Sequence, residues 1–377
     1  MEYDPVFGCM YKEGSPLEFQ ALQTVFYFLL TIGILVVAHE FGHYIVAKWC
    51  GMRVEEFAVG FGPKWIVLAR RGDTEYTIRP LPLGGFVRIA GMESHDETPA
   101  PGTFYSKPIW QRNAVVLAGP VMSLLLGYFI FSIMGMTVGL EIGKPMNRVA
   151  QVLPGTEAER MGLKTGDVIV EINKEPIRDG EHMMKVIHSS PGKRLFVRVK
   201  RDDQLILLSG VPKAYKEEEI KDGKKVVRTV GRLGFYPSFE TKRLSPWESL
   251  VAGTQITKNL ILSIPEHLFT KKVKDSVGGP VAIVQMTHTA AKEGLHRVLS
   301  FMAALSISLG ILNLFPIPIL DGGHLMLYFI EWLRGGRRLT ARQQMAVQMV
   351  GLAILLSILV LVTANDITRL IAGKFPQ

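Results

Sequence analysis

The sequence is short of charge and of cysteine for a protein of 377 residues. Charged residues make up 20% of it, and two cysteines, Cys9 and Cys50, cannot form a disulfide framework. Hydrophobic residues reach 48%, which excludes a disordered protein and an ordinary cytosolic enzyme. The net charge of +9 comes without a basic run that has interleaved aromatic residues, so we expect no nucleic-acid partner.

Charge is missing altogether from four long apolar stretches, at residues 21–38, 113–140, 298–320 and 343–365. About 20 apolar residues, at a rise of roughly 1.5 Å each, cross the hydrocarbon core of a bilayer. We therefore predict a polytopic α-helical membrane protein with four transmembrane helices and the lipid bilayer as a partner. The predicted spans are residues 19–47, 108–140, 298–333 and 343–372.

The distribution of basic residues predicts an orientation. Arginine and lysine concentrate in the connections 48–107 and 334–342, which places both on the cytoplasmic side. The N-terminal tail 1–18, the long connection 141–297 and the tail 373–377 then lie outside. We expect a multi-pass protein of a bacterial inner membrane, with its termini and long insert on the periplasmic or outer side.

The long insert has the alternating pattern of a folded α+β domain. Residues 149–173 predict a strand, a short helix closed by Gly162, a turn and a second strand. This pattern resembles a PDZ domain, to which we assign residues 141–213. Such domains bind an extended peptide by strand addition, although a steric filter for substrate ectodomains is an alternative role. Residues 214–297 predict a charged hairpin or loop and membrane-surface helices, with a helix break at Pro265.

The first span ends in a pattern that suggests metal chemistry, H-E-x-x-H at residues 39–43. Residues i and i+4 share one helix face, so His39 and His43 can each offer a ring nitrogen to one zinc ion. Glu40 can then serve as general base for water. Ionisable side chains at membrane depth are costly and functional by default, which favours a zinc site over an accidental pattern.

A catalytic zinc needs a third protein ligand and a free position for water. Asp321 is the good intramembrane candidate, because the third span brings it to the same side of the membrane as the end of the first. Pro316 and Pro318 interrupt the helical hydrogen bonds just before it. His324 would close the water position as a fourth ligand, so we interpret it as a supporting or structural residue.

Two motifs together resemble a known family. H-E-F-G-H at 39–43 and N-x-x-P-x-P-x-x-D-G-G at 313–323 are similar to the paired signatures of the site-2 protease family of intramembrane zinc metalloproteases. With a PDZ insert between the second and third spans, the sequence looks like the bacterial regulator of sigma-E protease branch of that family.

The resemblance implies roles for individual residues. His39, His43 and Asp321 would bind one catalytic Zn²⁺, and Glu40 would be the catalytic base. Asn313 would lie beside the site and hold substrate backbone or the developing oxyanion.

Residues 48–107 also carry strand-like alternation, at Thr74–Pro80 and Phe86–Ala90. The family resemblance suggests a membrane-associated β-hairpin that approaches the site and pairs with an extended substrate. An ordinary cytoplasmic hairpin is the alternative. The predicted substrate contacts are Gly84, Gly85 and Phe86.

The predicted function is hydrolysis of peptide bonds within transmembrane segments of single-span proteins, in regulated intramembrane proteolysis. By resemblance, substrates would be a transmembrane anti-sigma factor or remnant signal peptides. A PDZ-bearing scaffold with a structural zinc and a membrane-anchored metallopeptidase for soluble peptides are the alternatives. Glu40, which a structural zinc does not need, and the location of the motif within a span favour the intramembrane protease.

Overall fold

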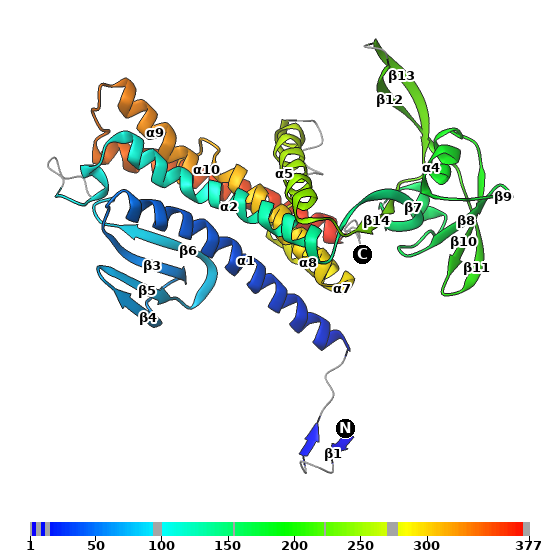
Figure 1. Ribbon diagram of the computed structural model, residues 1–377, viewed down its shortest axis with the longest axis horizontal. Coiled ribbons are helices and arrows are strands. Elements are labelled where there is room, and N and C mark those ends of the chain that lie inside the picture. Colours follow the sequence, from blue (N-terminus) through cyan, green and yellow to red (C-terminus); the bar gives the residue numbers. More distant parts are fainter. Residues whose placement is uncertain are drawn as a thin grey trace. The chain divides into compact units, whose positions relative to one another are not determined.

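The computed structural model divides into two compact units, residues 1–134 with 246–367 and residues 135–245 with 368–377. Figure 1 shows the elements of both units. The predicted tail 373–377 lies outside the residues that the structure describes. Those are residues 2–4, 9–11, 16–92, 100–153, 155–221, 224–269 and 278–371.

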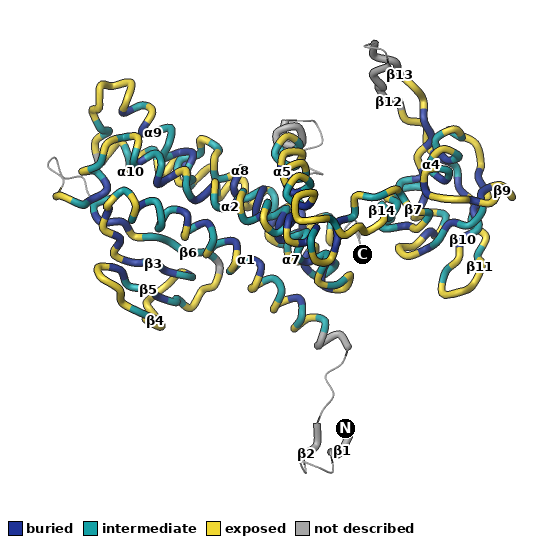
Figure 2. Tube along the Cα trace, viewed as in Figure 1, coloured by how far each residue is buried: buried dark blue, intermediate teal, exposed yellow. Residues whose placement is uncertain are grey.

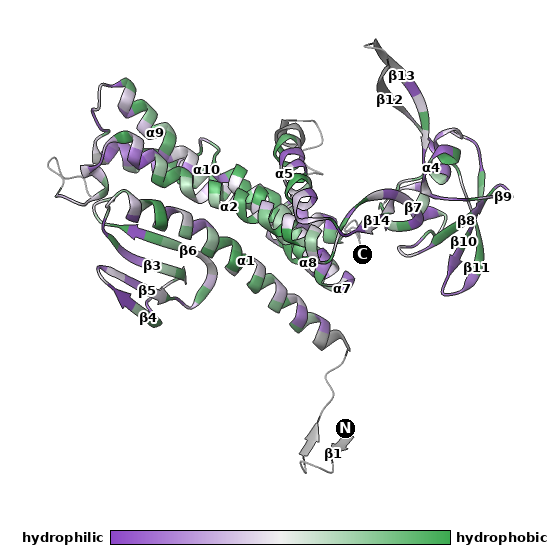
Figure 3. Ribbon diagram, in the orientation of Figure 1, coloured by the Kyte–Doolittle hydropathy of each residue, from purple (hydrophilic) through white to green (hydrophobic). Residues whose placement is uncertain are grey.

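Four helices are long and apolar enough to cross a membrane, as predicted. Hydrophobic colour is frequent along the first two of them in Figure 3, and exposed residues recur along the first in Figure 2. In the most apolar window of the last helix, only 6% of residues are buried within the protein. A bilayer covers exposed apolar surface of this extent. The four helices are α1 (Pro16–Trp49), α2 (Ile109–Thr137), α8 (Leu295–Asn313) and α10 (Ala341–Ile371).

The predicted third span, 298–333, is two helices. Helix α8 ends at Asn313, residues 314–320 are not helical, and α9 (Asp321–Leu333) begins at Asp321 itself. The two prolines of this segment lack the backbone N–H that would continue the helix, and Ile319 has a φ of +94°. The break therefore places Asp321 in the first turn of a new helix.

Three further helices of the first unit are η1 (Phe104–Ser106), α5 (Pro246–Phe269) and α7 (Pro280–Glu293). Helix α5 runs through Pro265, so the predicted break there is wrong; a proline removes one helical hydrogen bond without forcing the helix to end. Helix α7 contacts α1 and α8. At its start, the backbone N–H groups of Gly279 and Ala282 donate hydrogen bonds to the Asp366 carboxylate of α10, both at 2.9 Å.

The predicted β-hairpin is instead a four-stranded sheet with the order β4-β5-β3-β6. The two predicted strands, β5 and β6, do not pair with each other, because β3 lies between them, parallel to β5 and antiparallel to β6. Strand β6 is an edge strand, and it contacts α1. The strands are β3 (Val54–Phe61), β4 (Ile66–Arg71), β5 (Thr74–Ile78) and β6 (Leu81–Ile89).

A buried glutamate explains why the sequence pattern does not reveal β3. Glu56 is 2% exposed and sits between the buried residues Val54 and Ala58, where an alternating pattern calls for an apolar side chain. Its carboxylate accepts hydrogen bonds from Thr77 and from the Arg79 guanidinium, both at 2.7 Å. Both hydrogen bonds reach Oε1, and the cationic groups of Lys64 and Arg88 lie 4.0 and 3.6 Å from Oε2. These neighbours stabilise a charge that the hydrophobic pattern alone would place outside.

The second unit is built on one sheet of six strands, with the order β11-β10-β8-β7-β14 and β9 beside β8. Helices α3 (Glu157–Arg160) and α4 (Gly180–His188) accompany it, and α4 buries Met183 and Ile187 in the core. The charged hairpin predicted after it is present as β12 (Lys213–Lys221) and β13 (Lys224–Arg232). The sheet strands are β7 (Leu140–Val152), β8 (Val168–Ile172), β9 (Glu175–Pro176), β10 (Leu195–Arg201), β11 (Gln204–Gly210) and β14 (Phe235–Lys242).

Strand β14 extends this sheet beyond residue 213, the boundary expected from sequence. It pairs antiparallel with β7, from Phe235 opposite Val152 to Lys242 opposite Leu140. The hairpin β12–β13 separates it in sequence from the other strands, which hides the pairing from a local pattern. At the N-terminus, β1 (Glu2–Asp4) and β2 (Cys9–Tyr11) form a separate antiparallel pair.

Candidate metal centre

Helix α1 presents two histidines on one face. His39 and His43 are one turn apart, and their Nε2 atoms are 3.3 Å apart. His39 is 7% exposed, so the pair lies inside the helical unit. The spacing of four residues produces this juxtaposition directly, because side chains at i and i+4 project from the same side of a helix.

The carboxylate of Asp321 completes a three-residue group. Its Oδ2 lies 3.1 Å from His39 Nε2, and its Oδ1 lies 3.5 Å from His43 Nε2. Tetrahedral zinc with bonds of about 2.0–2.1 Å separates its ligand atoms by about 3.3 Å. The two nitrogens are 3.3 Å apart, each lies near this distance from one of the two carboxylate oxygens, and nitrogen and oxygen are donors that zinc accepts.

Helix α2 orients both imidazole rings. His43 Nδ1 donates to the carbonyl oxygen of Val115 at 2.8 Å, and His39 Nδ1 pairs with the Ser123 hydroxyl at 3.0 Å. The bond to the carbonyl fixes the proton of His43 on Nδ1 and leaves Nε2 free to bind a metal. Between these partners, Gly119 faces the rings: a Cβ there would lie 2.3 Å from His43 Nε2.

The sequence pattern does not predict these α2 contacts. A glycine followed by proline in an apolar span suggests a packing or kink position, yet Gly119 lies directly against the two ring nitrogens. The signal that could have found the contacts is the spacing of Val115, Gly119 and Ser123, which puts all three on one face of α2.

Two further predicted residues lie at this group. The Asn313 side-chain nitrogen is 3.3 Å from His39 Nε2, at the last residue of α8. Glu40 is half-buried on α1, and a Cβ built at Gly85 would lie 3.3 Å from its Cγ. Strand β6 therefore passes directly beside the predicted catalytic base.

The three residues predicted to contact substrate all lie on β6. At Gly84, with a φ of +143°, any side chain would collide with the Phe61 ring, and at Gly85 it would collide with the Ala58 carbonyl. The absence of side chains lets β6 lie close to β3 and α1. The Arg79 guanidinium lies over the Phe86 ring, with its Cζ atom 4.7 Å from the ring centroid.

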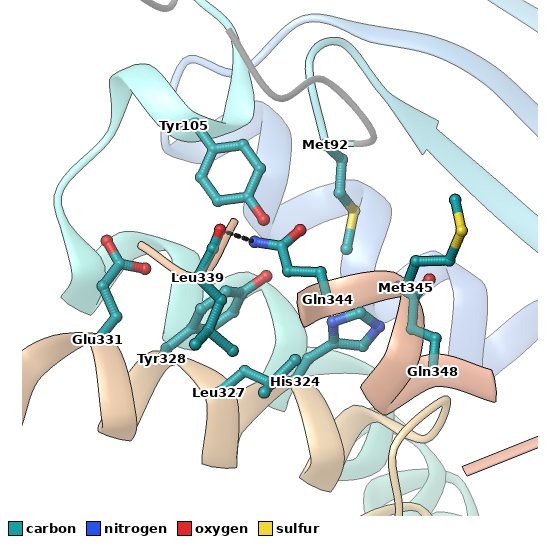
Figure 4. Close-up of a pocket in the computed structure, with 10 residues that line it drawn as sticks. All are labelled: Met92, Tyr105, His324, Leu327, Tyr328, Glu331, Leu339, Gln344, Met345 and Gln348. Carbon is teal, nitrogen blue, oxygen red and sulfur yellow. Dashed lines mark hydrogen bonds between the residues drawn. The ribbon is translucent and has the colours of Figure 1, made fainter. Parts of the chain in front are cut away.

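His324 does not belong to the three-residue group. It points into a separate pocket of about 270 Å³, shown in Figure 4 with Tyr105, Tyr328 and Gln344. Close to this pocket, the carboxylate of Glu331 forms a buried ion pair with Arg112 of α2. His324 is therefore not placed as a fourth ligand, and its role as a supporting or structural residue stays a prediction.

Comparison with known proteins identifies the family of this protein. The model of peptidase family M50 matches residues 27–358. The protein belongs to this family, the site-2 proteases. The regulator of sigma-W protease RasP of Bacillus subtilis is 33% identical, over 93% of this chain and 99% of that relative. The zinc metalloprotease RasP of Bacillus licheniformis is 30% identical, over 93% of this chain and 100% of that relative.

Membership confirms several predictions made from the sequence. The protein is a zinc metalloprotease and a multi-pass membrane protein, and its family supports intramembrane proteolysis. Zinc is the confirmed cofactor, and the His39, His43 and Asp321 group fits it. This outcome disfavours the scaffold alternative. The roles of individual residues stay predictions.

Proposed function

We propose that this protein cuts peptide bonds within the membrane at the group formed by His39, His43 and Asp321. The observation that carries the proposal is the convergence of their donor atoms in the first unit: each imidazole Nε2 lies 3.1–3.5 Å from an oxygen of the Asp321 carboxylate, and the two nitrogens are 3.3 Å apart. Glu40 extends from the same helix as both histidines and serves as the catalytic base.

The chemistry follows from these positions. Bound there, zinc supplies Lewis acidity that activates water near neutral pH and polarises the peptide carbonyl. Glu40 takes the proton from the attacking water and returns it to the leaving nitrogen. The Asn313 amide, adjacent to His39, can donate a hydrogen bond to the carbonyl oxygen as negative charge develops.

The substrate class follows from strand β6. A helical substrate keeps its carbonyls in i to i+4 hydrogen bonds, so it must become extended before attack. Strand β6 offers the edge of a sheet beside Glu40, where an extended segment can pair by strand addition. We therefore propose transmembrane segments of single-span proteins as substrates, with β6 as the pairing edge.

The second unit is proposed to be a PDZ domain that receives peptide. A groove of about 270 Å³ lies between α4 and β14, lined by Met184, His188 and residues 231–235. A strand edge beside a helix, closed by a segment that contains glycine, suits an extended peptide or the free carboxyl terminus of a protein. A steric filter without peptide binding is the competing role. Peptide titrations of the wild-type protein and of the groove variant His188→Glu would separate the two.

The relative from Bacillus subtilis is named as a regulator of sigma-W. We propose by analogy that an anti-sigma factor or a remnant signal peptide is a substrate here. We also propose that the termini and the insert lie outside the cytoplasm, with the metal site near the cytoplasmic side.

The decisive experiment compares wild type with Glu40→Gln. Both proteins are purified in detergent, assayed for bound zinc, and incubated with a single-span substrate shortened on its outer side. We expect one zinc per molecule in both proteins, cleavage within the span by wild type, and a loss of about 10²–10⁴-fold in Glu40→Gln.

Equal cleavage by the two proteins would refute the role of Glu40. Cleavage of soluble peptides with no cleavage of several single-span substrates would instead favour a membrane-anchored metallopeptidase.

A further inference from the structure

An apolar groove of about 500 Å³ runs along helix α1. Its lining on α1 extends from Leu29 to Phe41, and Met122 of α2 contributes to it. At about 1.5 Å per residue the groove covers roughly 18 Å of helix, or three turns. Its last residues, Ala38 and Phe41, flank His39 and Glu40 in sequence.

Gly33 lies inside this groove, and no packing contact among the described residues requires a glycine there. A Cβ added at this position would meet no atom of those residues within 4 Å. Glycine is less favourable than alanine in a helix interior, so its presence here needs another cause. Other glycines of the spans do have a neighbour within 3 Å of an added Cβ: Gly42, Gly119, Gly127, Gly310 and Gly351.

We infer that the groove at Gly33 is the docking site for the transmembrane helix of the substrate. The inference rests on the proposed function and names where that substrate binds. Glycine in an apolar helix face lets a second helix approach closely, as the backbone contact between Gly42 and Ala118 illustrates within this protein. Gly33 shares its face of α1 with Glu40, the proposed catalytic base, so the occupant of this face that must also reach Glu40 is the molecule that is cut.

The geometry also says where the substrate helix must unwind. Gly33 and Glu40 are seven residues apart, so they lie on nearly the same face of α1, about 10.5 Å apart along its axis. On that face Val36 contacts β6 at Gly85. A substrate helix seated at Gly33 therefore meets the strand edge two turns farther on, where it becomes extended before cleavage.

The first test fills the groove with Gly33→Leu. The substitution meets open space, so the protein should fold and bind zinc as wild type does. We expect at least a tenfold lower kcat/KM for a single-span substrate, mainly through KM. The matched control is Ala353→Leu on the exposed surface of α10, which should stay within twofold of wild type.

The second test measures direct contact between position 33 and the substrate helix. Gly33→Cys and the control Ala353→Cys are made with Glu40→Gln, and with Cys9 and Cys50 replaced by serine. Cysteines are scanned along the substrate span, and disulfide formation is measured. We expect crosslinks to position 33 at substrate positions three or four residues apart.

Three outcomes would overturn the inference. They are unchanged kcat/KM in Gly33→Leu with no crosslink above the control, a crosslink between two copies of this protein, and an effect of Gly33→Leu that disappears on changing the lipid. If wild type cuts none of the single-span substrates, the proposed function itself fails. The two failures are therefore distinguishable.

Discussion

Two carboxylates of helix α9, Asp321 and Glu331, have different kinds of partner. Glu331 receives both arms of the Arg112 guanidinium, at 2.8 and 2.9 Å, and the two side chains are 7% and 4% exposed. Asp321 instead faces the imidazole nitrogens of His39 and His43, at 3.1 and 3.5 Å. Arginine is always charged, whereas imidazole is commonly neutral near pH 7.

This is the difference that we expect between a structural carboxylate and a proposed metal ligand. The charge of Glu331 is compensated within the protein by a permanent cation in bidentate geometry. Among the residues that the structure describes, Asp321 has no such permanent cation as its partner, and its carboxylate lies instead beside two imidazole nitrogens that can share a metal ion with it. Glu56 of the sheet resembles Glu331, because Arg79 is its partner. Substituting each carboxylate should therefore have a different consequence.

The largest effect is expected from Asp321→Asn. It should reduce bound zinc to less than about one tenth per molecule and cleavage by roughly 10⁴-fold or more, because water activation and carbonyl polarisation are both lost. Zinc content by elemental analysis and cleavage of a single-span substrate measure this. Glu331→Gln, on the same helix, is the comparison variant: it loses stability because Arg112 is left without its carboxylate, but it should retain its zinc while folded. Zinc loss in both variants would remove the distinction between the two carboxylates.

The next largest effect is on stability, at the Arg112–Glu331 pair. Either Arg112→Met or Glu331→Leu leaves one buried charge unpaired, which costs about 3–5 kcal/mol. At about 2–4 °C per kcal/mol, the midpoint of thermal unfolding in detergent should fall by roughly 10 °C. The double variant has no unpaired charge and should recover most of this loss. A double variant as unstable as the two single losses combined would contradict the assignment.

The sequence predicts the three residues of the candidate metal centre but not the residues that surround them. His39 and His43 follow from helical spacing, and Asp321 follows from its place after two prolines that end a span. Gly119 and Ser123 lie in a charge-free apolar helix, where their spacing places them on one face but does not show that this face contacts the histidines. Only the packing of α2 against α1 reveals them.

The order of strands in the four-stranded sheet also could not be predicted from the local sequence pattern. Alternation identified β5 and β6, but their order depends on β3, whose inward face carries Glu56 in place of an apolar residue. The partner that makes Glu56 tolerable, Arg79, is 23 residues away in sequence. A local hydrophobic pattern contains no information on such a pairing, so the hairpin prediction was wrong.

A smaller effect is expected where a neutral group supports the metal site. Ser123→Ala removes the hydroxyl that pairs with His39 Nδ1. Loss of such a support typically weakens metal affinity or activity by about 10–100-fold. Zinc affinity measured by competition with a chelator tests this. The control is Ser132→Ala on the same helix, because the Ser132 hydroxyl donates to the backbone carbonyl of Tyr128. Equal affinities in the two variants would exclude a role for Ser123.

The smallest effect is a pH dependence at Glu56. Burial acts to raise the pKa of this carboxyl, but hydrogen bonds from Arg79 and Thr77 outweigh it and lower the pKa below its usual value near 4.5. A carboxyl with a lowered pKa in the folded state stabilises the protein above its unfolded pKa, and this stabilisation disappears as the pH falls through the folded pKa. Because the hydrogen bond from Arg79 to Glu56 is charge-assisted, we expect this stabilisation to be about 2 kcal/mol at neutral pH.

Glu56→Gln should therefore lower the unfolding midpoint at pH 7 by about 5 °C and have progressively less effect below about pH 4.5. Thermal unfolding in detergent between about pH 3 and pH 7 measures it. Glu55→Gln is the matched control, because Glu55 is the exposed neighbour on the same strand. A pH-independent difference between Glu56→Gln and wild type would mean that packing, and not the charge held by Arg79, makes Glu56 stabilising. The likeness between Glu56 and Glu331 would then not hold.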